Sequence, residues 1–263
     1  MSDPLSSPER APFERRHLNV RGAHVHYQVG GAGDPVVLIH GLSGSGRWWR
    51  RNAPVLASRF RVFVVDLVGF GRSSGPFALD EGAGVLAEWM VRLGLRQAHV
   101  IGHSMGGYLA AELAAGEAVE VERLVLVDAA AFPLGWRPVR HATSLLRAAR
   151  YMHPTFLPVL ATDALRAGPR TLFRAAREVV ETDLEARCAD VQAPTLVVWG
   201  EHDRVVPLAD GERLAACLPD AEFVVIEGAG HNPMWDRPAA FNRAVSDFLG
   251  GRRDSQRQTG AGE

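Results

Sequence analysis

The chain of 263 residues contains no lysine, and all of its 29 basic residues are arginine. A Schiff base with a substrate or with pyridoxal phosphate needs a lysine amine, and so does the phosphate-binding loop of the Walker type. The absence of lysine therefore excludes aldolase-type chemistry, pyridoxal-phosphate chemistry and nucleotide hydrolysis of the Walker type.

Cysteines, net charge and long apolar runs are also scarce. Cys188 and Cys217 lie far apart without the spacing of a metal site, so we expect reduced thiols, a cytoplasmic location and no metal. The net charge of −1 offers no overall field to nucleic acid. No run approaches the roughly 18 apolar residues of a membrane span, and the polar N-terminus lacks the apolar core of a signal peptide.

Short apolar runs rich in β-branched residues alternate with helical patterns along the chain. This alternation predicts an α/β fold, a mostly parallel, doubly wound sheet with helices on both faces. Hydrophobicity is continuous within the runs, which is typical of strands covered on both sides. The expected core strands are 36–39, 61–65, 98–101, 123–127, 195–199 and 222–226. The alternating segment 24–29 predicts an antiparallel strand at the edge.

The spacing of these runs divides the chain into a core and an insert. About 60 residues separate the fourth and fifth runs, where a strand–helix crossover needs about half as many. We expect residues 17–131 and 194–249 to form the core, and residues 132–193 to form a helical lid over the strand ends. Two polar segments are expected to be a flexible arm and a disordered tail, namely 1–16 and 250–263.

The segment 100–107 carries Gly-x-Ser-x-Gly between an apolar run and a helix-forming segment. Glycine at positions 102 and 106 lets a strand and a helix pass closely, and Ser104 is expected at a sharp, strained turn between them. Such a turn exposes the serine Oγ and leaves backbone N–H groups at the start of the helix facing an anion. Ser104 is therefore the candidate nucleophile.

A serine nucleophile needs a base, and the base needs an orienting group. In a parallel sheet we expect both on loops that follow the carboxyl ends of strands. Asp203 follows the fifth apolar run and His231 follows the sixth. These positions allow a carboxylate and an imidazole to converge on Ser104, and the order Ser, Asp, His is that of the α/β hydrolases.

With these residues in place, the chain resembles the α/β-hydrolase fold superfamily, in its lidded, serine esterase-like branch, from about residue 23 to residue 249. Five motifs in order carry the resemblance: His40-Gly41, Asp66-x-x-Gly69-x-Gly71-x-Ser73, the turn at Ser104, Gly200-x-x-Asp203-x-x-x-Pro207 and Gly230-His231-x-Pro233. One mild departure is Asp236, where the family more often carries glutamate.

The resemblance implies a role for each of these residues. Ser104 would be the nucleophile, His231 the general base and acid, and Asp203 the group that holds the imidazole tautomer. The backbone N–H groups of Leu42 and Met105 would form the oxyanion hole. Asp128, at the end of the fourth run, is the alternative position of the triad acid in relatives. No cofactor is implied.

Specificity is expected to come from the lid and from loops near the triad. An apolar substrate pocket has these candidates: Trp48, Trp49, Phe132, Trp136, Met234 and Trp235. Packing of the core against the lid would account for the same side chains. The lid is also rich in arginine, at positions 137, 140, 147, 150, 166, 170, 174 and 177. Attraction of an anionic substrate or an acidic carrier protein would explain this charge, as would a solvated helix face.

The expected activity is hydrolysis of a carboxylic ester of a small or medium, largely apolar substrate, through an acyl-enzyme on Ser104. The same triad would also cleave a thioester, a lactone or a C–C bond beside a ketone. The fold supports cofactor-free perhydrolysis and lyase reactions, and a ligand receptor with weak hydrolysis, so fold and triad leave the reaction class open.

Overall fold

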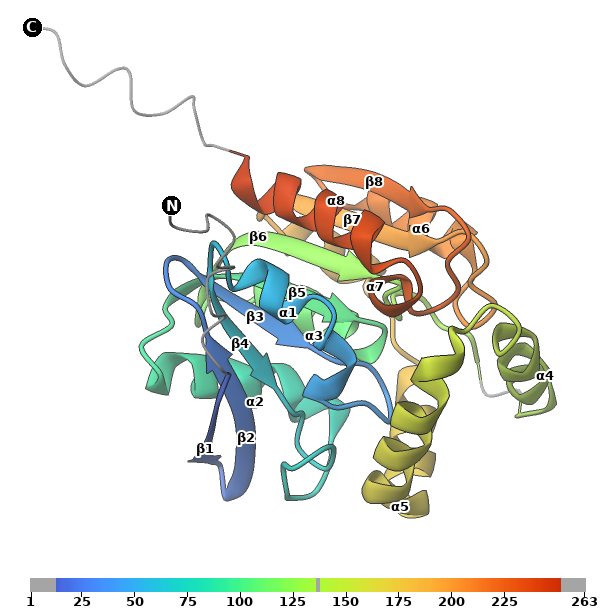
Figure 1. The fold of residues 1–263 in the computed structure, drawn as a ribbon, viewed down its shortest axis with the longest axis horizontal. Helices are drawn as coiled ribbons and strands as arrows, with labels where there is room; N and C mark the ends of the chain where they lie inside the picture. Colours follow the sequence, from blue (N-terminus) through green and yellow to red (C-terminus); the bar gives the residue numbers. More distant parts are fainter. Residues whose placement is uncertain (1–12, 136–137, 252–263) are drawn as a thin grey trace, which may run out of the picture.

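The computed structural model describes residues 13–135 and 138–251. Its centre is an eight-stranded sheet with the order β1-β2-β4-β3-β5-β6-β7-β8 (Figure 1). The strands are β1 (Glu14–Val20), β2 (Ala23–Gly30), β3 (Pro35–Ile39), β4 (Arg61–Val65), β5 (Gln97–His103), β6 (Glu120–Val127), β7 (Thr195–Gly200) and β8 (Ala221–Ile226). β1 and β2 are antiparallel, whereas β3 to β8 pair in parallel. The predicted α/β fold is confirmed.

Helices cover both faces of the sheet, and the parallel strands β3, β4, β5 and β7 are almost entirely buried, whereas β8 at the edge is mostly half-buried or exposed. The helices of the core are α1 (Ala53–Leu56), α2 (Leu79–Arg92), α3 (Met105–Ala114), α6 (Leu208–Cys217), α7 (Pro233–Asp236) and α8 (Pro238–Gly250), with a 3-10 turn η1 (Gly46–Trp49) after β3. Residues of α2, α3 and α6 share one apolar cluster, and residues of η1, α1, α7 and α8 share the other. Burial on both faces explains why the strands are continuous apolar runs.

The ends of the core differ from the expected boundaries. Residues 14–16, predicted to lie in the flexible arm, belong to β1 and pair with β2. This edge strand is mostly exposed, so its polar sequence carried no apolar alternation that would have marked a strand. Gly250, predicted in the tail, closes α8. Residues 1–12 of the predicted arm and 252–263 of the predicted tail lie outside the described residues.

The segment between β6 and β7 contains α4 (Pro138–Ala148), η2 (Pro154–Phe156), α5 (Leu157–Val179) and η3 (Glu185–Asp190). Figure 1 shows α4 and α5 beside the sheet rather than within its layers. At Gly168, φ is 75° and ψ is 159°, which breaks α5 just before Pro169. We call residues 132–193 the helical insert; its action as a lid stays a prediction.

The prediction of reduced cysteines is wrong in this structure, because Cys188 and Cys217 form a disulfide with Cα atoms 5.7 Å apart. The bond joins η3 to the end of α6. Spacing along the chain did not reveal the pair, since these two elements meet only when the insert returns to β7. The disulfide removes the support that reduced thiols gave to a cytoplasmic location. Among the described residues, no helix is long and apolar enough to cross a membrane.

A buried carboxylate ties the helical insert to the core. Asp163 of α5 is fully buried; its Oδ2 accepts a hydrogen bond from the Ser45 hydroxyl (2.8 Å), and its Oδ1 accepts one from the Arg47 guanidinium (3.0 Å). A buried carboxylate is stable only when such donors replace water. The two hydrogen bonds therefore fix α5 against the loop that follows β3.

We expect Asp163→Ala to lower the free energy of unfolding by about 2 kcal/mol, because the buried Ser45 hydroxyl and the Arg47 guanidinium lose their acceptor. Urea denaturation measures this change. The exposed Glu181 serves as the matched control, and Glu181→Ala should stay within about 0.5 kcal/mol of wild type. Equal losses in the two variants would contradict a role for Asp163 in docking the insert.

Candidate active site

Ser104 lies at the turn between β5 and α3, with φ 53° and ψ −117°. Non-glycine residues rarely adopt this conformation, which costs about 1–3 kcal/mol and persists only where the surroundings hold it. The Ser104 N–H donates to the carbonyl of Val127 (2.9 Å), and its own carbonyl accepts from the N–H groups of Gly107, Tyr108 and Ala130. These bonds to α3 and to the β6 end hold the strained turn that the sequence predicts.

The turn depends on a very close approach of α3 to β3. A Cβ atom placed on Gly106 would lie 2.5 Å from the carbonyl oxygen of His40 and 2.6 Å from that of Ile39. A Cβ on Gly102 would collide with the carbonyl of Gly106. Because all of these obstacles are backbone atoms, no rotamer change could relieve the contact. Glycine is therefore required at both positions.

We expect Gly106→Ala to destabilise the fold by about 3 kcal/mol, since the backbone of β3 or α3 must shift to admit the methyl group. Gly116→Ala is the control, because a Cβ there would meet no atom closer than 3.5 Å. Thermal unfolding of both variants measures the difference. Similar melting temperatures for the two would show that the close approach is not needed.

The structure brings Ser104, His231 and Asp203 into one hydrogen-bonded line. His231 Nε2 lies 3.2 Å from Ser104 Oγ, and His231 Nδ1 lies 2.7 Å from Asp203 Oδ2. The other oxygen of Asp203 accepts from the N–H groups of Val205 (2.7 Å) and Val206 (3.1 Å). Since a carboxylate only accepts, Nδ1 carries the proton, and Nε2 is free to accept the serine proton. This arrangement can activate Ser104 as a nucleophile.

A second histidine, His103, holds the backbone of His231. Its Nε2 lies 2.7 Å from the carbonyl oxygen of His231, so Nε2 is the protonated donor. Burial lowers the pKa of His103 well below its usual value, and the neighbouring His231 lowers this pKa further. His103 is therefore neutral and positions His231 rather than acting as a base. The sequence indicates only that a histidine beside the nucleophile packs or hydrogen-bonds locally, because no local pattern shows which carbonyl it faces.

His40 fixes the loop that precedes Leu42. Its Nε2 accepts from the N–H of Leu67 (3.0 Å), so its Nδ1–H donates to the carbonyl of Gly41 (2.8 Å). Burial lowers the pKa of His40 and favours the neutral form that these two bonds require. The tautomer is thus set, and the backbone just before Leu42 is held in place.

The predicted oxyanion donors are at suitable points of the backbone. Met105 is the first residue of α3, where a helix offers no acceptor for the N–H group. Neither the Met105 N–H nor the Leu42 N–H donates a hydrogen bond to another residue in the described part of the chain. Both groups are available to an anion, and their role in catalysis stays a prediction.

Asp128, the alternative acid, lies beside the triad but does not bind the imidazole. It is fully buried, and its Oδ1 accepts from the N–H of Gly200 (2.9 Å). Burial, together with the negative charge of Asp203, raises the pKa of Asp128 well above its usual value. A protonated Asp128 can donate toward Asp203. The geometry therefore favours Asp203 as the partner of His231.

One group of side chains could be mistaken for a metal site. His103, Asp128 and His231 each place a ligand atom within 4.8 Å of the others. The ring nitrogens of His231 already face Ser104 and Asp203, and the protonated form of Asp128 is a poor ligand. We assign no metal to these residues.

The candidate pocket residues are mostly part of the core. Trp49, Met234 and Trp235 are fully buried in the cluster shared with α8, and the Nε1 of Trp235 lies 3.2 Å from the hydroxyl of Thr155. Phe132 lies under the guanidinium of Arg213, 3.9 Å from its ring centre.

Trp48 is the candidate aromatic in contact with the histidines of the site, and it packs between His103 and Phe156, with ring centres 5.6 and 5.0 Å apart. Trp136 lies outside the described residues. A contact of any of these six residues with substrate stays a prediction.

Asp236 makes two hydrogen bonds beside His231 that the sequence did not predict. Its Oδ2 accepts from the N–H of Gly230 (3.1 Å), directly before His231, and its Oδ1 accepts from the N–H of His153 (2.9 Å) in the helical insert. Burial raises the pKa of Asp236. The residue joins the histidine loop to the insert. The sequence feature that could have pointed to this role is the acidic side chain at a position where the resemblance expects glutamate.

The sheet order, the turn at Ser104 and the Ser–His–Asp arrangement define a hydrolase of the α/β class. The chain belongs to the alpha/beta hydrolase family, whose model matches residues 36–244.

Individual proteins of known sequence or structure are similar to the chain over most of its length. The chain is 32% identical to a 2-hydroxy-6-oxononadienedioate/2-hydroxy-6-oxononatrienedioate hydrolase of Paraburkholderia phymatum, over 95% of this chain and 100% of the relative. It is 30% identical to a 2-hydroxy-6-oxo-6-phenylhexa-2,4-dienoate hydrolase of Burkholderia cepacia, over 86% and 91%. The structure of a thermophilic esterase from Thermogutta terrifontis is similar, with a TM-score of 0.77, 27% identity and coverage of 90% and 98%.

Proposed function

We propose that the chain hydrolyses a carbon–carbon bond beside a ketone, in a substrate of the 2-hydroxy-6-oxodienoate type. The observation that carries a hydrolytic reaction is the hydrogen-bonding distance of 3.2 Å between Ser104 Oγ and His231 Nε2. The bond type is supported by the names of the relatives from Paraburkholderia phymatum and Burkholderia cepacia described above. C–C cleavage was one of the alternatives left open by the sequence, and it takes precedence here over the ester hydrolysis expected first.

In the first step Ser104 Oγ adds to the ketone carbon. His231 Nε2 takes the serine proton, one C–O bond forms, and the carbonyl electron pair moves onto its oxygen. The N–H groups of Leu42 and Met105 stabilise this oxyanion, a contribution of about 3 kcal/mol for each donor. Asp203 stabilises the imidazolium and keeps Nδ1 protonated.

In the second step the carbon–carbon bond breaks, and its electron pair leaves with the dienoate fragment. For this the 2-hydroxyl proton must first move to the carbon beside the ketone, which leaves a 2-oxo group conjugated with that carbon. When the bond breaks, the electron pair is delocalised onto the 2-oxo oxygen as a dienolate, and His231 returns the serine proton to it. The acyl group stays on Ser104 until a water molecule, deprotonated by His231, releases it as a carboxylic acid. The net reaction adds one water molecule across the bond.

The two bond types are distinguished by comparing kcat/KM for a 6-phenyl-2-hydroxy-6-oxohexadienoate and for a 4-nitrophenyl ester of a short acid. The proposal expects the ketone substrate to be favoured by more than about 100-fold, equivalent to about 3 kcal/mol. Ser104→Ala is the control and should remove both activities. Preference for the ester by a similar factor would overturn C–C cleavage.

A carboxylic ester is the second candidate substrate, and the similarity to the Thermogutta terrifontis esterase favours it. Both candidates are small molecules and use the same triad. Thioesters, lactones, perhydrolysis, lyase reactions, a receptor role and an acidic carrier protein stay predictions from the sequence.

A further inference from the structure

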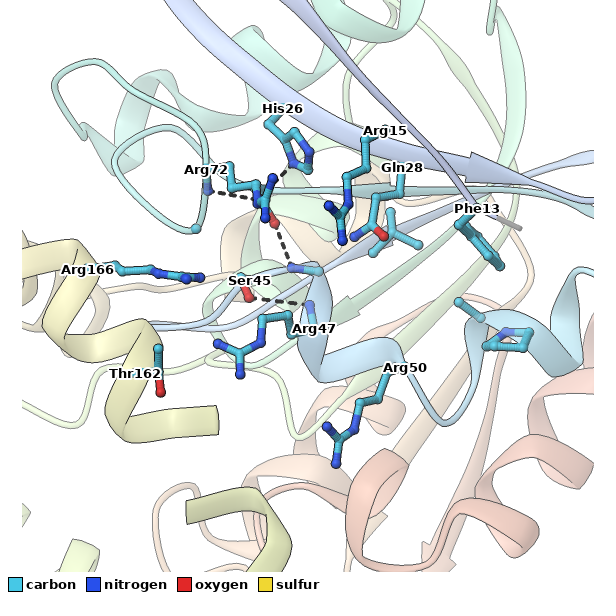
Figure 2. Close-up of a pocket in the computed structure, with 16 residues that line it drawn as sticks. Phe13, Arg15, His26, Gln28, Ser45, Arg47, Arg50, Arg72, Thr162 and Arg166 are labelled. Atoms are coloured by element: carbon cyan, nitrogen blue, oxygen red, sulfur yellow. Dashed lines mark hydrogen bonds and ion pairs between the residues drawn. The ribbon is translucent and has the colours of Figure 1, made fainter. Parts of the chain in front are cut away.

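A cavity of about 430 Å³ lies between the β1–β2 side of the sheet, η1 and α5 (Figure 2). None of the triad residues lines it. Five arginines line it, four from the core and one from the helical insert: Arg15, Arg47, Arg50, Arg72 and Arg166. The cavity is thus a cationic space separate from the candidate active site.

These cations are only partly neutralised by the protein. Arg15 and Arg72 form no ion pair with any residue that the structure describes. Arg47 and Arg166 share a single carboxylate oxygen, Asp163 Oδ1, at 3.0 and 3.9 Å. Like charges around one cavity raise the local potential and attract an anion.

Asp66 is the acidic residue in the wall, and its oxygens are already in use. Oδ1 accepts from the N–H of Gly46 (2.6 Å), and Oδ2 accepts from the N–H of Arg72 (2.9 Å) and from His26 Nδ1 (3.0 Å). The carboxylate therefore organises the floor of the cavity. Even with the charges of Asp66 and Asp163 included, five guanidinium groups leave an excess of positive charge.

His26 is a further polar residue in the wall of the cavity. The residue is about nine-tenths buried and lines the cavity, and its Nε2 has no hydrogen-bond partner among the described residues. A buried polar atom without a partner is costly in a folded protein, and such groups are usually satisfied by water or a ligand. Because His26 Nδ1 donates to Asp66 Oδ2, Nε2 is an acceptor, and an anionic oxygen cannot satisfy it. His26 therefore shapes the wall of the cavity rather than binding an anion.

The two ends of the cavity differ in chemistry. Figure 2 shows Arg166 and Thr162 at one end and Phe13 at the other, with Arg15 and Arg72 between them. Ala53, Pro54 and Val64 also contribute apolar surface to the wall. The fifth arginine, Arg50, lies 4.3 Å from the ring centre of Trp235. A ligand with an anionic end and a flat, apolar end would match both parts.

We propose that this cavity binds a small ligand that carries two or more phosphate groups, of the size of a nucleoside diphosphate. The guanidinium groups of Arg15, Arg72 and Arg166 bind phosphate oxygens, for which the planar fork of arginine is well suited. Phe13 packs against Gly30 and also lines the cavity, where its ring can contact a base. Phosphate is favoured over a carboxylate because it concentrates more charge and more acceptor oxygens in the same volume.

Isothermal titration of the full chain with ADP, pyrophosphate, adenosine and citrate tests this site. ADP or pyrophosphate should bind at least about tenfold more tightly than adenosine and citrate, with an affinity that falls as salt rises. Arg15→Gln and Arg72→Gln should each weaken that binding about tenfold, which is the loss expected for one charged hydrogen bond. Because neither arginine has an ion pair, both variants should keep the wild-type melting temperature. Arg96→Gln, an exposed arginine away from the cavity, is the matched control.

The two phosphate probes separate the possible sources of the ligand. Tighter binding of ADP supports a nucleotide, and equal binding supports recognition of the phosphates alone. The proposal is overturned if neither probe binds, if citrate binds more tightly than both, or if the two arginine variants bind as well as Arg96→Gln.

Discussion

Replacing Ser104 by alanine is expected to lower kcat by about 10⁶-fold while leaving the fold intact. The hydroxyl is the group that His231 deprotonates at 3.2 Å, and the variant has no other atom that could form the acyl bond at this turn. Residual turnover would come from binding and from the N–H groups of Leu42 and Met105. Turnover of the ketone substrate by purified protein measures the change.

The backbone of Ser104 supplies a control on folding. Alanine keeps a Cβ at φ 53°, so Ser104→Ala should melt near the wild-type temperature, whereas Ser104→Gly should melt higher because glycine relieves the strain. Both variants should be inactive. If the alanine variant is unfolded, its lack of activity does not test the role of the Ser104 hydroxyl. The activity of the folded glycine variant then provides that test. Appreciable activity in a folded variant would contradict a role for Ser104.

The second large effect is expected at Asp203. Asp203→Asn should lower kcat by about 10⁴-fold, because an amide in place of Oδ2 no longer holds the Nδ1–H tautomer of His231. Asp128→Asn should keep activity within about tenfold of wild type, since its Oδ1 still accepts from the N–H of Gly200 and its amide replaces a protonated carboxyl. Steady-state kinetics of both variants make the comparison. A larger loss in Asp128→Asn would make Asp128 the triad acid.

Stability as a function of pH tests the protonated state of Asp128 independently. Burial and the charge of Asp203 raise the pKa of Asp128 in the folded chain well above the ordinary value of 3.8. Above pH 3.8 the unfolded chain loses this proton while the folded chain keeps it, so wild-type stability falls as the pH rises toward the folded pKa. Asp128→Asn cannot lose a proton and should become more stable relative to wild type over the same interval. A constant difference between the two would show that Asp128 is ionised in the fold.

That Ser104, Asp203 and His231 would lie together could be predicted from the sequence, because each follows a strand; their catalytic role stays a prediction. Ser104, Asp203 and His231 each come directly after a buried apolar run, and parallel strands end at one edge of the sheet. The need for glycine at position 106 could also be predicted, because the start of α3 contacts the backbone of β3. These features depend on local pattern and on a general rule of topology.

The remaining contacts join positions that no local pattern connects. Ser45 and Asp163 are 118 residues apart, and their hydrogen bond exists only because α5 returns to the loop after β3. The Cys188–Cys217 disulfide likewise depends on how the insert packs on α6. The candidate pocket residues show a different limit of sequence analysis. The apolar character of Trp49 and Trp235 does not tell a pocket wall from a core, and both side chains are fully buried in the structure.

The most direct test of an activated serine is labelling with a fluorophosphonate, followed by mass spectrometry of the modified peptide. We expect one adduct, on Ser104, and labelling that is lost in His231→Ala and much slower in Asp203→Asn than in Asp128→Asn. A folded wild-type protein that is not labelled, or is labelled at another serine, would contradict the assignment of Ser104, His231 and Asp203 as the catalytic triad.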